Sequence, residues 1–403
     1  MPGGTHPRRN HGYALLALVT LLGLFTLLAV VRFVRVAGAD QNAVEHDSAV
    51  LNQAKEALLG YAATYRDTHA SIPPPSVGFL PCPASDGNGS AAGACSVQGS
   101  AVAGMLPFRT LSLPDLRNSR GECLWYAVAG TAKNSPSLLQ FNWDVQGQFV
   151  IRDANGNPLA TAPNSADGGP VAAIIAVGPP IGAQSRARAS TTCGHTPVLA
   201  QFIEGGPVFP NAGIVDLRSG AAGSQTANDR VVWITGKELF DRIDKRADFA
   251  PMLNGLIDEM ASCLGYGLPA PVSPSTTFGT NTFGIVPNVT TSGTPSICPP
   301  SGVSVNTDQI QLWRNWRELF RYMRCGGGTQ CATVNAAACR GVLIFGGKRA
   351  SGQSRATVTD KASAGNYLEG TILGTWTAGG LHYVGPGVYD PASPANDVVR
   401  CLN

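Results

Sequence analysis

The chain has 403 residues, a formal net charge of +3, and charged side chains at only 14% of its positions. This balance, with no Lys/Arg cluster interleaved with aromatic residues, argues against a nucleic-acid partner. The length allows one large domain or two modest ones, and 48 glycines and 29 prolines predict many turns and long loops.

A basic leader, residues 1–12, precedes an uncharged apolar stretch, residues 13–31. At about 1.5 Å per residue, a helix of this length crosses a hydrocarbon core of roughly 30 Å. The leader contains Arg8 and Arg9 and no acidic residue, so the positive-inside rule places it in the cytoplasm. The sequence therefore predicts a single membrane span with the rest of the chain on the opposite side.

Three kinds of N-terminal segment compete here. A cleaved secretory signal would use the Ala37-Gly38-Ala39 site, but the apolar run is longer than the usual 7–15 residues or so, and Arg32 and Arg35 intervene. An uncleaved signal anchor fits well. A third possibility is cleavage after Gly12, between leader and apolar helix, which would make Tyr13 the new N-terminus.

The helix is expected to continue far beyond the membrane. No proline interrupts residues 13–72, and Val44, Leu51 and Leu58 recur at seven-residue spacing. Within residues 13–72 we expect one continuous helix of about 50 residues, roughly 75 Å long, and the prolines at 73–75 end it.

A block of short motifs follows the predicted helix. It consists of LPCP at 80–83, DG at 86–87, LPFRTL at 106–111 and GECLWY at 121–126. With the preceding helix, this block resembles a proteobacterial group of type IV pilin-like and type II secretion minor pseudopilin-like proteins, whose pattern is LPCP…DG…LPxRTLxLxxLR…GExLWY. The resemblance covers the N-terminal third and continues more loosely through residues 228–235.

The resemblance implies a non-enzymatic, pilin-like minor subunit of a type IV pilus or a type II secretion pseudopilus. Its partners would be other pilin or pseudopilin subunits, the prepilin peptidase that cuts between Gly12 and Tyr13, and the bacterial inner membrane. The head would lie in the periplasm or be exported on a filament. Pilins usually carry a glutamate where this chain has Ala17, and the large pseudopilin thought to cap the tip lacks it too. The alternative is a membrane-anchored periplasmic protein with a ligand-binding, adhesive or hydrolytic head.

The predicted fold class is α+β: the long helix packed on an antiparallel sheet head with inserted helices and long loops. Residues 73–264 form the first part of the head. Strands are predicted at 123–130, 171–178 and 230–234, and Thr235 begins a helical region that reaches Cys263. Asn155-Gly156 lies between two apolar runs and predicts a hairpin.

The same turn has a second interpretation. Asp153, Asn155 and Asn157 are spaced so that their oxygens could bind calcium, whereas Asx residues and glycine also form turns without a metal. The distant glutamate of an EF-hand is missing, so the turn is favoured and no cofactor is expected.

Residues 265–308 are rich in Pro, Ser, Thr and Gly, which predicts a long loop or linker. Residues 309–403 are expected to form a helix followed by a β-rich part. The helix spans Gln309–Arg324, with aromatic and aliphatic residues on one side and Arg314, Arg317 and Arg321 on the other. Such a helix can bind a membrane surface, but packing on the core of the head is the commoner use.

Cysteine usage indicates an oxidising compartment, because ten cysteines follow the apolar stretch and none has zinc-like spacing. Short-range disulfide candidates are Cys82 with Cys95 and pairs among Cys325, Cys331 and Cys339, and Cys401 could fix the C-terminus. The remaining candidates are Cys123, Cys193, Cys263 and Cys298.

We find no catalytic constellation in the sequence and expect no enzyme. Residues 341–348 approach a P-loop, but Gly347 stands where the lysine belongs and the intervening residues look like a buried strand. Cys193 and His195 could suggest a thiol nucleophile, although a disulfide is the favoured role for Cys193.

Overall fold

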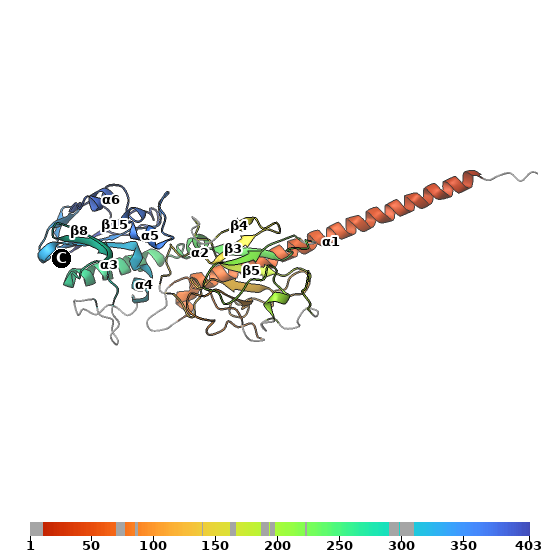
Figure 1. The fold of residues 1–403 in the computed structure, drawn as a ribbon, viewed down its shortest axis with the longest axis horizontal. Coiled ribbons are helices and arrows are strands. Elements are labelled where there is room, and N and C mark those ends of the chain that lie inside the picture. Colours follow the sequence, from red (N-terminus) through yellow and green to blue (C-terminus); the bar gives the residue numbers. More distant parts are fainter. Residues whose placement is uncertain are drawn as a thin grey trace, which may run out of the picture.

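The computed structural model describes residues 11–69, 77–84, 88–138, 140–161, 167–186, 193, 198–221, 224–289, 298 and 310–403. These residues form a mixed α+β protein with mainly antiparallel sheets, which confirms the predicted fold class at this level. Figure 1 shows two lobes in a row, with one long helix projecting from the first lobe.

The N-terminal helix α1 runs without a break from His11 to Thr68, over 58 residues. The predicted continuous helix is thus confirmed as far as Thr68, and the expected stop at residues 73–75 lies outside the described residues. Its second half packs in the first lobe, and its first half extends away from it (Figure 1). A search of the described residues finds no helix with the length and apolarity expected of a membrane span.

The first lobe is built on an antiparallel sheet of order β1-β2-β5-β7, to which α1 and α2 pack. Its strands are β1 (Val102–Met105), β2 (Trp125–Val128), β5 (Pro170–Ala176) and β7 (Arg230–Thr235), and α2 spans Gly236–Ile243. The predicted strands at 123–130, 171–178 and 230–234 correspond to β2, β5 and β7. Every residue of β5 is buried, because strands flank it on both sides and α1 contacts it.

A smaller sheet of order β4-β3-β6 completes this lobe. It contains β3 (Phe149–Arg152), β4 (Pro158–Ala160) and β6 (Val215–Arg218), and a short 3-10 helix, Leu199–Gln201, precedes β6. β3 and β4 pair antiparallel around the Asn155-Gly156 turn, so the predicted hairpin is confirmed. β3 and β6 pair in parallel.

The second lobe is built on an antiparallel sheet of order β15-β13-β10-β9-β8. Its strands are β8 (Val272–Phe278), β9 (Asn281–Ile285), β10 (Phe320–Arg324), β13 (Gly341–Phe345) and β15 (Val398–Leu402). A small sheet of order β12-β11-β14 adds β11 (Ala332–Val334), β12 (Ala337–Cys339) and β14 (His382–Tyr383). The helices are α3 (Phe249–Gly267), α4 (Ile310–Trp316), α5 (Val358–Ala362) and α6 (Gly370–Thr377), with 3-10 turns at Arg317–Leu319, Gly326–Gly328 and Ala364–Asn366.

The predicted antiparallel head is confirmed for the main sheet of each lobe, whereas the pairs β3/β6 and β11/β14 in the two small sheets are parallel. One sequence prediction about the head is wrong. Residues 265–308 are not simply a linker, because α3 reaches Gly267 and the β8/β9 hairpin occupies 272–285. Uncharged Ser/Thr composition suits an exposed strand as well as a loop, so composition alone did not separate the two.

The predicted helix Gln309–Arg324 is wrong in its second half. The helix ends at Trp316, and Phe320–Arg324 form strand β10 in the middle of the sheet, paired with β9 and β13. A strand buried on both faces shows no period-two pattern, so its sequence resembled a continuing helix. The expected packing on the core is confirmed, since Trp313, Trp316 and Phe320 are fully buried.

Candidate functional site: helix α1 and the base of the head

The first half of α1 exposes apolar side chains around its whole circumference. They occupy all sides of the helix and are each between 54% and 66% exposed: Leu16, Leu18, Val19, Leu21, Leu22, Leu24, Phe25, Leu27, Leu28 and Val30. Soluble monomers rarely expose a contiguous apolar surface of this size.

Two threonine side chains within this half bond to their own helix. The Thr20 hydroxyl donates to the Leu16 carbonyl oxygen at 3.0 Å, and the Thr26 hydroxyl donates to the Gly23 carbonyl oxygen at 2.9 Å. Such bonds satisfy a hydroxyl without water, which is a requirement in an apolar environment.

The second half of α1 is an integral part of the first lobe. Apolar residues at three- and four-residue spacing are buried against the sheet and α2: Val50, Leu51, Ala54, Leu58, Leu59, Ala62 and Tyr65. Replacing a buried leucine at such a position by alanine typically lowers the free energy of unfolding by about 2–5 kcal/mol. The two halves therefore differ in environment although they form one helix.

Ion pairs hold this second half in place along its length. The Lys55 Nζ atom lies 2.7 Å from the Glu238 carboxylate. Glu238 is in the first turn of α2, where its backbone N–H donates to the capping Thr235 hydroxyl. Near the end of α1, Arg246 lies 2.7 Å from Asp67 and also donates to the Ala63 carbonyl oxygen. Hydrogen bonds from Arg246 lower the pKa of Asp67, and the carboxylates around Arg246 raise the pKa of that guanidinium.

The helix is also fixed where it enters the head. The buried Asp47 accepts a hydrogen bond from the Ser119 backbone N–H at 2.6 Å, and Arg230 of β7 lies 3.8 Å from its other oxygen. Arg230 additionally donates to the Val44 carbonyl oxygen at 3.0 Å. These contacts tie α1 to strand β7 and to the loop before β2, so the helix leaves the head in a defined direction.

A groove of about 630 Å³ lies beside this point. It is lined by α1, by the β3/β4 turn, by the loop before β7 and by β7 itself: Val44, Ser48, Leu51, Asp153, Ala154, Asn155, Ser219, Gly220, Ala221, Arg230, Val231 and Val232. The lining combines apolar residues with Ser48, Asp153, Asn155, Ser219 and Arg230.

Two of the three calcium candidates, Asp153 and Asn155, line this groove, and the geometry of their turn is that of an Asx turn. The Asp153 carboxylate accepts hydrogen bonds from the backbone N–H groups of Asn155 and Asn157, at 2.9 and 2.8 Å, and from the Asn157 side chain at 3.0 Å. These bonds lower the pKa of Asp153, the Asn157 side chain contributing most. The observed bonds support the turn interpretation, because the carboxylate already serves the loop's own N–H groups.

All ten cysteines form disulfides. The pairs are Cys82–Cys95, Cys123–Cys193, Cys263–Cys298, Cys325–Cys331 and Cys339–Cys401. Cys82–Cys95 is the predicted short-range pair, and Cys339–Cys401 fixes the C-terminal strand to β12. Spacing alone did not predict Cys123–Cys193 and Cys263–Cys298, which join residues 70 and 35 apart.

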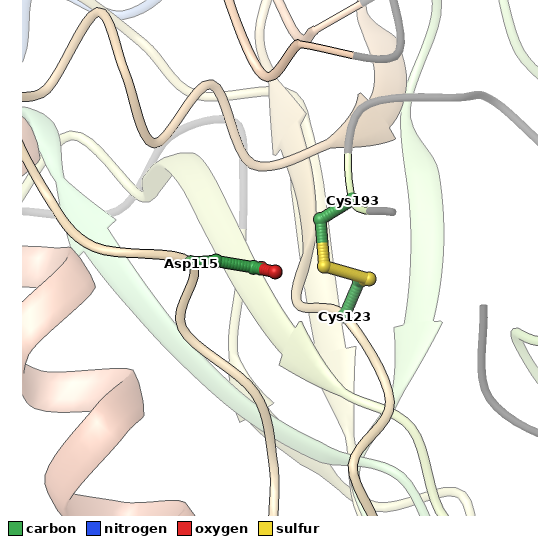
Figure 2. A group of neighbouring side chains, drawn as sticks. All are labelled: Asp115, Cys123 and Cys193. Atoms are coloured by element: carbon green, nitrogen blue, oxygen red, sulfur yellow. A yellow bond between two sulfur atoms is a disulfide. The ribbon is translucent and has the colours of Figure 1, made fainter. Parts of the chain in front are cut away.

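One group resembles a metal site at first sight. Asp115, Cys123 and Cys193 place a carboxylate oxygen and two sulfur atoms within 4.8 Å of one another. Figure 2 shows that the two sulfurs are joined in the disulfide, with Asp115 beside it. Disulfide sulfurs are not thiolates, so this group lacks the ligands that zinc requires. The same bond removes the thiol that a Cys193 nucleophile would need, and His195 lies outside the described residues.

Sequence inspection missed a buried pair of carboxylates, Glu204 and Asp229, although Asp229 belongs to the 228–235 motif. Asp229 accepts a hydrogen bond from the Gly178 backbone N–H at 2.8 Å, and Glu204 accepts one from the Asp229 backbone N–H at 3.2 Å. Burial, followed by the neighbouring Glu204, raises the pKa of Asp229 to about 8. The buried Glu204/Asp229 pair therefore retains a proton to higher pH than an ordinary aspartate does.

The near P-loop at 341–348 is a strand, as its apolar residues indicated. Residues 341–345 form β13, and Lys348 forms an ion pair with Asp244. A lysine committed to a carboxylate in this way is not positioned to bind a phosphate.

Comparisons with protein-family models, with curated proteins and with solved structures gave no match for this chain.

Proposed function

We propose that this protein is a non-enzymatic, pilin-like minor subunit, anchored in a bacterial inner membrane by residues 13–31 of α1. The observation that carries the proposal is the division of one continuous helix into an exposed apolar half and a half packed on an antiparallel sheet. Type IV pilins and pseudopilins share this division, with the apolar half in the bilayer before assembly and in the filament core afterwards. The proposed partners are other pilin or pseudopilin subunits and the prepilin peptidase.

Membrane insertion is part of the proposal and is supported by the apolar run itself. Residues 13–31 contain no Asp, Glu, Lys or Arg, and the basic leader precedes them directly. A 19-residue helix is about 28 Å long, close to the roughly 30 Å of a hydrocarbon core. The internal bonds of Thr20 and Thr26 are compatible with this environment.

The place of the subunit in a filament follows from residue 17. In pilins the glutamate at this position is thought to meet the N-terminal amine of a neighbouring subunit, and here it is Ala17. A subunit without this carboxylate lacks that contact, so we propose a minor position, with the tip as the preferred one. The second lobe adds to this preference, because it lies at the end of the molecule opposite the projecting helix (Figure 1).

The test is the intact mass of the protein isolated from membranes of a host with a functional prepilin peptidase. The proposal expects loss of residues 1–12 and a methylated Tyr13. Gly12→Ala should abolish this processing, whereas the matched control Gly23→Ala should be processed normally, because Gly23 lies in the same helix with open space around it. An intact N-terminus would contradict pilin processing and favour a plain signal anchor. A chain beginning at Asp40 would contradict membrane anchoring altogether.

A further inference from the structure

Two buried carboxylates meet in the first lobe without a cationic partner. Glu204 is 6% exposed and Asp229 is fully buried. The Asp229 side chain accepts a hydrogen bond from the Glu204 backbone N–H at 3.3 Å, and the Glu204 side chain accepts one from the Asp229 backbone N–H at 3.2 Å. Among the described residues, no lysine, arginine or histidine forms an ion pair with either carboxylate. Buried carboxylates are normally paired, bound to a metal or protonated.

The arginine of the neighbouring loop is engaged elsewhere. Arg186 lies 3.7 Å from the Glu122 carboxylate, and its guanidinium donates to three backbone oxygens, one of them that of Gly178. Arg186 interacts electrostatically with Glu122, Asp229 and Glu204. If these three carboxylates are all ionised, one guanidinium faces three negative charges. The cluster therefore lacks positive charge.

Two oxygen atoms in this cluster have no hydrogen-bond partner among the described residues. They are Oε1 of Glu204 and Oδ1 of Asn228, and both are buried. The Asn228 backbone N–H donates to the other Glu204 oxygen at 3.3 Å. Its side-chain nitrogen donates to the Pro179 oxygen at 2.9 Å, which leaves Oδ1 beside Gly178, the residue whose N–H donates to Asp229. A buried acceptor without a donor is costly, so two of them in one cluster indicate a missing donor or cation.

A groove of about 370 Å³ gives access to this cluster. Glu204 lines it, together with Gln184, Gln201, Gln225 and Thr226, and Glu204 is the one charged residue of the described lining. A groove of this size and polarity admits a small ion with its water molecules.

We propose that Glu204, Asn228 and Asp229 bind one divalent cation that prefers oxygen ligands, of the calcium or magnesium class. The available ligand atoms are carboxylate and amide oxygens, which suit such hard cations and do not suit zinc. Water in the groove would complete the coordination. The inference does not rest on the pilin-like function, because it concerns only the chemistry of this cluster.

The cation would replace a proton. Burial, and then the hydrogen bond with Glu204, raise the pKa of Asp229, so the pair retains a proton when no cation is bound. Carboxylates must lose their protons to bind a metal, so cation and proton compete for the same oxygens.

The test titrates the full-length protein in detergent micelles, first dialysed against EDTA, with calcium and separately with magnesium, by isothermal titration calorimetry. We expect one saturable site for at least one of the two ions. Glu204→Gln and Asp229→Asn should each weaken binding about tenfold or more, because each removes a negative charge from the ligand set. The matched control Asp153→Asn removes a carboxylate from the β3/β4 turn and should leave binding unchanged.

Hydrogen exchange locates the ion without altering the protein. The saturating ion should slow amide exchange several-fold at residues 203–206 and 227–230 of the wild type and leave the turn at 153–157 unchanged. If a variant fails to fold, this wild-type pattern decides between the two positions. The proposal is overturned if no saturable binding occurs, or if Glu204→Gln binds like the wild type, which would mean an adventitious ion only. Loss of binding in Asp153→Asn, with protection confined to 153–157, would also overturn it.

Discussion

The indole rings of Trp143 and Trp316 meet edge to face, with centroids 4.8 Å apart and planes at 82°. Trp143 belongs to the first lobe and Trp316 ends α4 in the second. Trp143 also contacts Phe249 and Phe345, and its indole N–H donates to Asp244 at 3.0 Å. The hydrophobic core is therefore continuous between the lobes, and both should unfold together.

Replacing Trp143 tests this shared core. Trp143→Ala should lower the free energy of unfolding by about 3–5 kcal/mol, because it removes a large buried ring and leaves a cavity. Urea unfolding followed by circular dichroism and by fluorescence should give one coincident transition for the wild type. Val358→Ala, at an exposed position, should have almost no effect. Two separate wild-type transitions, with only one shifted by the substitution, would contradict a common core.

The carboxylate of Asp229 should make the protein less stable as the pH rises. Its folded-state pKa of about 8 lies above the ordinary aspartate value, so between about pH 4 and pH 8 the folded state holds a proton that the unfolded state has lost. Stability should fall across this range, by up to about 1.4 kcal/mol per pH unit for each such group. Burial also raises the pKa of Asp397 to about 8, so this residue should contribute a second loss of stability over the same pH range.

The measurement is urea unfolding at pH 5 and pH 7.5. Asp229→Asn should reduce the difference in unfolding free energy between the two pH values, because the amide does not titrate. Asp390→Asn, at an exposed position, serves as the control. An unchanged pH dependence in Asp229→Asn would show that the buried pair does not retain a proton.

The disulfides should differ in their contribution to stability according to the chain they enclose. Cys123–Cys193 joins residues 70 apart, and Cys325–Cys331 joins residues 6 apart. Loop-closure entropy predicts that replacing the first pair by alanines lowers the free energy of unfolding by roughly 4 kcal/mol, and that replacing the second pair lowers it by roughly 2 kcal/mol. Urea unfolding of the two double variants measures the order, and a larger loss from the short pair would contradict this entropic account.

Arg246 should matter more than its neighbour Arg242 for holding the end of α1. Arg246 contacts Asp67, Asp248 and the Ala63 carbonyl, whereas Arg242 lies 3.8 Å from Glu56 with both side chains exposed. Arg246→Ala should lower the free energy of unfolding by about 1–3 kcal/mol. It should also speed amide hydrogen exchange in the last turns of α1. Arg242→Ala should cost at most about 1 kcal/mol. Equal exchange in the two variants would refute the role given to Arg246.

Local sequence determined the features that need no distant partner. A proline-free stretch gave the unbroken helix α1, the Asn155-Gly156 turn gave the β3/β4 hairpin, and a run of apolar residues gave β5. The short spacing of Cys82 and Cys95 likewise pointed to their bond. Each of these depends on backbone preferences and contacts within a few residues.

Tertiary structure decided the features that depend on residues far apart in the chain. Phe320–Arg324 form a strand because β9 and β13 lie on either side, although the same residues continue a helical pattern. Glu204 and Asp229 share a site because two loops meet there, and β8 is an edge because nothing in the described residues pairs beyond it. Pairing and burial outweigh local preference at such positions, since a strand or a buried charge obtains its stability from partners that the neighbouring sequence does not specify.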